Sequence, residues 1–226
     1  MKLSHPSFTL RALTTATSAL AAAGLISTSS AALLLNPTGG TVLASSSTGP
    51  SDKDDGYATS IESLDVPFFG SALSDPFPRI SLNGHIYFGG GDGMGDYNPV
   101  AFDNSPVTRI SPLWTDLLLG PTSQVLQNVG SGSSYNAITW VNMQGGIGNE
   151  GFTATFQAIY FNAAANINGV SFNAGDIVFS YGDIQNFNTP ADILTGLDKG
   201  TGATALATLP GYEATKGWAS HSVYGN

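Results

Sequence analysis

Three aspartates lie in or beside a glycine-rich stretch, residues 89–96, which runs Gly-Gly-Gly-Asp-Gly-Met-Gly-Asp. Asp92, Asp96 and the following Asp103 are hard oxygen ligands of the kind that calcium takes from flexible loops. The EF-hand spacing is absent, so we predict a solvated connection whose glycines adopt positive φ and keep calcium binding as the alternative. Nucleotide binding is not predicted, because the stretch has no lysine and no following helix. We expect that the protein needs no metal. If it binds calcium, we expect the ion at this stretch.

An aromatic ring beside a carboxylate can stack on a sugar and hydrogen-bond to it, and Trp114 and Asp116 offer that pair. The neighbouring Pro112 and the leucines at 117–119 favour a different interpretation, in which a core tryptophan is followed by an aspartate that caps a turn. We take the structural interpretation as the prediction and keep the sugar site as its alternative.

Catalytic constellations are not indicated. The chain has no cysteine, and only His85 and His221 follow the N-terminal segment, so a zinc site is not expected. A G-x-S-x-G elbow is missing. Pairs of carboxylates for glycoside cleavage can be drawn from Glu62, Glu150 and Glu213, but such pairs occur in any acidic protein. The sequence predicts a protein that is not an enzyme, with no catalytic, cofactor-binding or metal-ligating set.

The charge of the chain argues against nucleic acid as a partner. Sixteen Asp and Glu stand against seven Lys and Arg. Two of the cations, Lys2 and Arg11, precede an apolar stretch over residues 12–26 and small residues over 27–32, a pattern typical of a secretory signal peptide. We predict a signal peptide over residues 1–31, cleavage near Ala32, a secreted chain and no membrane-spanning segment after it.

The elements that would position any site are short strands. Residues 32–60 are rich in Ser, Thr, Gly and Asp, and we predict a flexible leader there, followed by one β domain over residues 61–226. Strands are expected where apolar residues alternate or cluster between turn residues. They are 79–82 and 85–88, joined by Asn83-Gly84, then 124–129, 135–141, 152–161, 177–181 and 203–209.

The alternation also predicts the core. Trp140, Phe156, Ala158 and Phe179 are expected to be almost fully buried, residues 135–141 to lie centrally, and the strand at 152–161 to be buried on one face only. Frequent turns and no periodic helix predict an all-β antiparallel sandwich or partly closed barrel.

The order of several motifs over residues 83–211 resembles the NIDO family of nidogen-type and tectorin-type extracellular proteins. The matching pieces are Asn83-Gly84 with 86–89, 110–116, 137–141, 155–159, 177–182, 195–197 and 209–211. The resemblance implies cell-matrix or cell-surface adhesion with an extracellular protein or glycan as partner. A secreted carbohydrate-binding protein or glycan-directed hydrolase is the alternative. Exposed aromatic candidates for contact are Tyr57, Tyr97, Tyr212, Trp218 and Tyr224.

Overall fold

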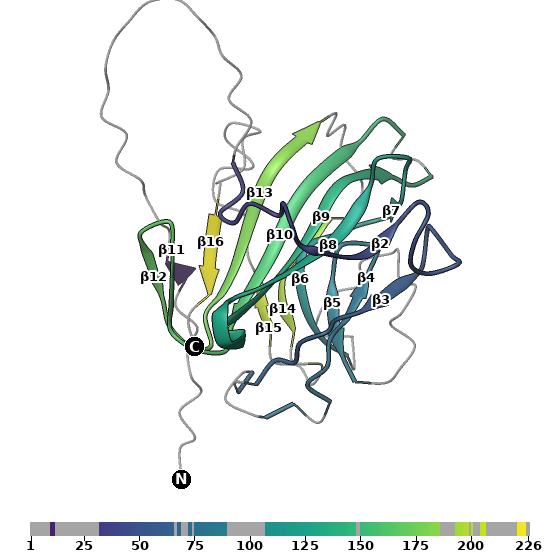
Figure 1. The fold of residues 1–226 in the computed structure, drawn as a ribbon. Coiled ribbons are helices and arrows are strands. Elements are labelled where there is room, and N and C mark those ends of the chain that lie inside the picture. The colour runs from purple at the N-terminus through teal and green to yellow at the C-terminus, as the bar shows by residue number, and fades with distance from the viewer. Residues whose placement is uncertain are drawn as a thin grey trace, which may run out of the picture.

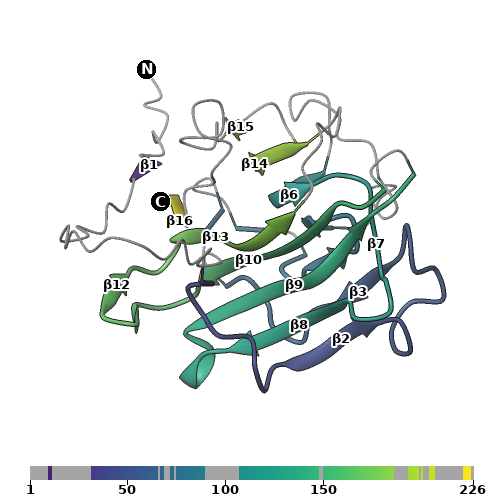
Figure 2. The same cartoon turned by 90° about the horizontal axis from the view of Figure 1, so that it is seen from above.

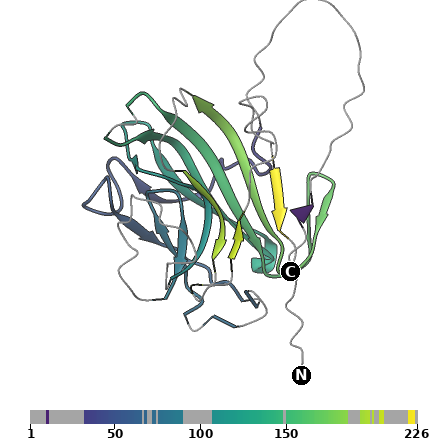
Figure 3. The same cartoon turned by 180° about the vertical axis from the view of Figure 1, so that it is seen from behind.

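Two antiparallel sheets pack face to face as a sandwich that does not close into a barrel (Figures 1 and 3). The computed structural model describes residues 10–11, 32–65, 67–68, 72–73, 75–89, 107–147, 150–185, 193–198, 200, 204–206 and 221–224. In this part of the chain the only helical element is a short 3-10 turn, Ser131–Ser133. The predicted all-β class is confirmed as a sandwich.

The larger sheet has the order β1-β16-β13-β10-β9-β8-β2, with β7 paired to β9 (Figure 2). Its long central strands contain many β-branched and aromatic residues, which suit a pleated surface that is covered on both sides. The strands are β1 (Leu10–Arg11), β2 (Thr41–Ser45), β7 (Leu117–Leu118), β8 (Gln124–Val129), β9 (Tyr135–Gly145), β10 (Thr153–Phe161), β13 (Ile177–Gln185) and β16 (His221–Tyr224).

The smaller sheet has the order β15-β14-β6-β5-β4-β3, and a separate hairpin pairs β11 with β12. The strands of the smaller sheet are β3 (Tyr57–Thr59), β4 (Arg79–Ser81), β5 (Ile86–Phe88), β6 (Thr108–Trp114), β14 (Leu194–Asp198) and β15 (Thr204–Leu206). The hairpin consists of β11 (Ala165–Ile167) and β12 (Val170–Phe172). It interrupts the connection between β10 and β13, which pair with each other.

The turn between β4 and β5 differs from the expected two-residue Asn-Gly loop. The N–H of Ser81 donates to the carbonyl of His85, and the N–H of Gly84 donates to the carbonyl of Ser81. Gly84 has a φ of 77°. The loop therefore contains three residues, 82–84, in which a tight turn is followed by a glycine in the left-handed region.

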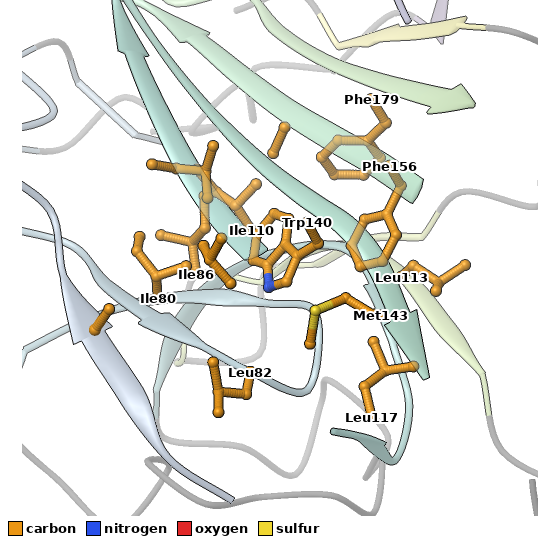
Figure 4. Packing of buried hydrophobic residues seen from close by; sticks show 14 of the residues in the cluster. Ile80, Leu82, Ile86, Ile110, Leu113, Leu117, Trp140, Met143, Phe156 and Phe179 are labelled. Carbon is orange, nitrogen blue, oxygen red and sulfur yellow. The ribbon is translucent and has the colours of Figure 1, made fainter. Parts of the chain in front are cut away.

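The main core lies between the two sheets. Trp140 and Phe156, on the neighbouring strands β9 and β10, stack with ring centroids 5.0 Å apart, and both are buried (Figure 4). The Trp140 Nε1–H donates to the carbonyl of Ser81 in the opposite sheet at 2.9 Å. Ala158 and Phe179 are buried in the same cluster, so the four predicted core residues and the central position of β9 are confirmed.

The predicted flexible leader over residues 32–60 is wrong. β2 pairs with β8 and forms an edge of the larger sheet, while β3 pairs with β4 and forms an edge of the smaller one. Ala44 and Ala58 are buried in the main core. The domain therefore extends to the N-terminal side of residue 61. The prediction failed because the residues that these strands bury in the core include small alanines. Such strands show no run of large apolar residues in the sequence.

The outer face of the larger sheet is also covered, contrary to the expectation that β10 is buried on one face only. Residues 32–36, which we call the N-terminal strap, cross this face from β13 towards β2 (dark purple in Figure 1). A second apolar cluster forms beneath the strap and the β11–β12 hairpin. Its buried members are Leu34, Ala137, Ile159, Phe161, Ile167, Phe172 and Val178.

Candidate functional site

A row of polar side chains crosses the outer face of the smaller sheet. Arg79 is the register partner of Tyr87, Tyr87 of Arg109, and Arg109 of Asp198. Thr59 faces Arg79 at the β3 edge. Because the residues between them, such as Ile80, Ile86 and Ile110, point into the core, strand alternation places this row on the opposite face. The face thus carries two cations, a phenol and a carboxylate in register.

Aromatic rings support the buried cation of this row. The Arg109 guanidinium carbon lies 4.2 Å from the ring centroid of Trp114, a cation–π contact. The ring of His85 lies 4.9 Å from Trp114 and 5.8 Å from Tyr87. Both contacts are of the tilted kind that aromatic quadrupoles favour. The rings and the guanidinium therefore form one continuous layer over β5 and β6.

Burial changes along the row. His85, Tyr87, Arg109 and Asp198 are buried, although they lie on the outer face of the sheet. At the β3 edge Tyr57 is 38% exposed, and its ring meets that of Tyr87 edge-on at 6.3 Å. Tyr57 is the accessible end of an otherwise buried aromatic layer. The prediction that this tyrosine is exposed is confirmed.

Two hydroxyl groups on this face retain hydrogen-bonding capacity. In the part of the chain that the structure describes, the Tyr87 and Ser111 hydroxyls are buried without a hydrogen-bond partner. Such groups are uncommon in folded proteins, where a buried hydroxyl normally finds a protein or water partner. Burial, followed by the nearby Tyr57, raises the pKa of Tyr87 far above its usual value, and Arg79 and Arg109 only partly oppose this. Tyr87 is therefore a neutral phenol that can donate.

A second polar group gathers around the Asn83 turn. The Asn83 side chain accepts from the Leu117 N–H at 2.7 Å and donates to Asp55 at 3.0 Å. Burial, then Asp54 and Asp55, raise the pKa of the Asp116 carboxyl above its usual value. No group of three or more acidic or histidine side chains suited to a metal ion occurs among the described residues. The contacts of Asn83 with Leu117 and Asp55 therefore stabilise the turn.

Trp114 and Asp116 do not converge on one surface as a sugar site would require. Trp114 is fully buried against Arg109 and His85, so the structural interpretation of the tryptophan is confirmed. The capping role belongs to Asn83, whose side chain binds the Leu117 N–H, while Asp116 offers its backbone carbonyl to the N–H of Gly146 at 3.0 Å. The predicted capping aspartate is thus corrected to a capping asparagine.

Some of the other residues named from the sequence are described by the structure, and some are not. Glu62 and Glu150 lie in different loops, and Glu62 uses its backbone carbonyl to accept from Ser60 and Tyr160. The described ranges exclude the calcium-candidate aspartates, several aromatic candidates and the greater part of the predicted signal peptide. These are Asp92, Asp96, Asp103, Tyr97, Glu213, Tyr212, Trp218 and residues 1–9 and 12–31. His221 and Tyr224 are described in their backbone within β16.

The sequence prediction singled out no member of this row, and Arg109 and Asp198 are its buried charged members. A signal was present, since Arg109 is one of few cations and directly precedes the apolar Ile110 in a strand-like segment. A charged residue in an alternating strand marks the face opposite the core. Asp198 shows the same alternation after Leu197, but its partner across the sheet could be assigned only from the register.

The described residues contain no helix of the length and apolar character that a membrane crossing needs. No family model matches the chain, and neither a curated protein nor a solved structure matches it. The resemblance to the NIDO family, the signal peptide and secretion therefore stay predictions.

Proposed function

We propose that the chain is a secreted, adhesion-type binding module that acts without turnover and binds its partner on the outer face of the smaller sheet. The observation that carries this proposal is the aromatic and charged layer of that face, which ends at the exposed Tyr57. Interface residues that contribute most to affinity are commonly Tyr, Trp and Arg held rigidly by their neighbours. Tyr57 has such support from Tyr87, which lies beside Arg109 in register.

The surface around Tyr57 combines an aromatic ring with polar groups. Thr59 on the same strand is exposed, and Arg79 on the next strand is held by an ion pair to Asp75 at 3.1 Å and by the carbonyl of Gly89 at 3.0 Å. A fixed guanidinium loses little freedom when a partner docks. The edge of β3 and β4 is thus preorganised for contact with an extracellular macromolecule.

A glycan is the second candidate partner, and the alternation of rings with hydrogen-bonding groups favours it. Tyr57 supplies an accessible ring that is supported by the buried Tyr87, and Arg79 and Thr59 supply donors and acceptors at the same edge. Sugars present both apolar ring faces and hydroxyl groups, so one surface can satisfy both. The motif order that resembles the NIDO family supports the protein-binding form of the proposal equally.

The test is a binding screen of the purified full chain against arrays of matrix proteins and cell-surface glycans. Tyr57→Ala should lose the signal of any partner that the parent chain binds, while Ile147→Ala should keep it, since Ile147 is 90% exposed in the β9–β10 connection of the other sheet. Release of reducing sugar from a bound glycan would show turnover and would contradict the proposal. Equal loss in both variants would also contradict it.

A further inference from the structure

The N-terminal strap is held through its backbone. The Leu34 N–H donates to the Ser180 hydroxyl at 2.8 Å, and the Leu34 carbonyl accepts from the Asn168 amide at 2.6 Å. The Gln157 side chain binds both sides of Leu35, accepting from its N–H and donating to its carbonyl, each at 3.3 Å. Four backbone atoms of two consecutive residues are therefore bound by side chains of β13, β10 and the β11–β12 turn.

The groups that hold the strap lie next to one another on three neighbouring strands. Gln157, Thr139 and Ser180 are buried side by side on β10, β9 and β13, where Gln157 is in register with both of the others. The Gln157 amide also donates to the Thr139 hydroxyl at 2.7 Å, which fixes its orientation. Leu34 is a buried member of the second apolar cluster, to which Ile159 also belongs. This is a groove for a bent backbone segment whose Leu34 is buried and whose Leu35 packs partly against the same cluster.

Contacts of this kind recognise the backbone of two consecutive residues and a buried aliphatic side chain, and any copy of the strap meets both requirements. The strap joins the rest of the chain through a short turn, residues 37–40, in which the Gly40 N–H donates to the Pro37 carbonyl at 3.0 Å. Gly39 has a φ of 82°. If this turn opens, and once the chain has been cut near Ala32 as predicted, the strap can leave its own groove while β2 stays paired with β8.

We propose that the groove is an exchange site, in which the strap of one copy docks into the groove of a second copy and joins two chains into a dimer. The occupant is a second copy of this chain, because its strap reproduces every hydrogen bond and the Leu34 contact. Exchange of an identical element is a common route to dimers and depends on the concentration of the chain. Such a dimer carries two copies of the Tyr57 face.

The absence of cysteine from the chain allows a direct crosslinking test. A methyl carbon at Gly182 would lie 3.4 Å from the Leu33 Cδ2, and the φ of Gly182 is not in the left-handed region. Leu33→Cys and Gly182→Cys therefore place one thiol on the strap and one beside the groove. The double variant in one chain confirms the geometry when it forms an intrachain disulfide at high dilution.

The exchange experiment mixes full chains that carry Leu33→Cys alone with chains that carry Gly182→Cys alone, co-refolds them from denaturant and oxidises them. We expect the mixed disulfide dimer to exceed by at least about tenfold the yield from Leu33→Cys mixed with Ile147→Cys, which reports random collision. Light scattering of the parent chain should show a dimer fraction that grows with concentration. An intrachain disulfide in the double variant, with mixed dimer no higher than the Ile147 control, would overturn the proposal.

Discussion

Substituting Gly84 by alanine tests the close approach between the β4–β5 turn and β6. Gly84 has a φ of 77°, and an added methyl carbon would overlap the Leu113 carbonyl oxygen and lie 3.0 Å from the Phe156 Cζ. The left-handed conformation alone costs a residue with a Cβ about 1–2 kcal/mol. Overpacking against fixed neighbours adds about 1–3 kcal/mol. Gly84→Ala should therefore lower the free energy of unfolding by about 2–5 kcal/mol.

Gly169 provides a matched control, because its φ is 83° and no heavy atom lies within 4 Å of an added methyl carbon. Gly169→Ala should show the conformational cost alone, about 1–2 kcal/mol. Urea unfolding followed by tryptophan fluorescence measures both, provided that the slope m stays constant. If Gly84→Ala proved no more damaging than Gly169→Ala, the turn could not lie against the Leu113 carbonyl, and the packing of the β4–β5 turn on β6 would be refuted.

Three further predictions concern the core and the titrating groups. Phe156→Ala should cost about 3–5 kcal/mol in urea unfolding, because Phe156 is buried against Trp140, whereas Phe77→Ala, at a site 53% exposed, should cost well under half of that. Because the Asp116 pKa is raised in the folded chain, its contribution to stability is full below pH 3.8 and is lost as pH rises through the folded pKa. Asp116→Asn should therefore gain stability relative to the parent between pH 4 and 7, and a constant difference in thermal melts would contradict the raised pKa. Burial also raises the pKa of Tyr160 above its usual 10.0, so the parent should lose stability above pH 10 more steeply than Tyr160→Phe, measured by denaturant titration at each pH.

Strand alternation predicted the parts of the fold where one side chain in two is large and apolar. Gln124–Val129 matches its predicted strand residue by residue, and β9 and β10 were found with their core faces. The buried face of these strands can be read from the sequence, because alternate side chains point to opposite faces and the face that carries Trp140 or Phe156 is the one that is buried. Local sequence is sufficient in such segments.

The N-terminal region could not be predicted from local sequence, because its order comes from tertiary contacts. Ala44 in β2 and Leu34 in the strap are buried by strands far along the chain. The hydrogen bonds of the strap join residues separated by 122 to 146 positions. A segment rich in Ser, Thr and Gly has the composition of a flexible leader, and only the groove of β9, β10 and β13 makes it an ordered part of the sandwich.

The polar face of the smaller sheet was partly visible in the sequence. Trp114 was singled out as a structural residue, and its ring contact with His85 agrees with that prediction. Their assembly with Arg109 and Asp198 required the register of β5, β6 and β14. Arg109 and Asp198 are separated by 89 positions, and only the pairing of β6 with β14 shows that they are neighbours.

The most direct test of the proposed binding face compares dissociation constants for the partner that the array identifies. Tyr57 is partly exposed, and its ring contacts the buried Tyr87. Tyr57→Ala should therefore raise the dissociation constant by at least about thirtyfold, which corresponds to a loss of about 2 kcal/mol in binding free energy. Ile147→Ala on the other sheet should leave the constant within about twofold of the parent. Titration calorimetry on the two variants and the parent, at equal thermal stability, gives the comparison. Unchanged affinity of Tyr57→Ala would contradict binding on the outer face of the smaller sheet.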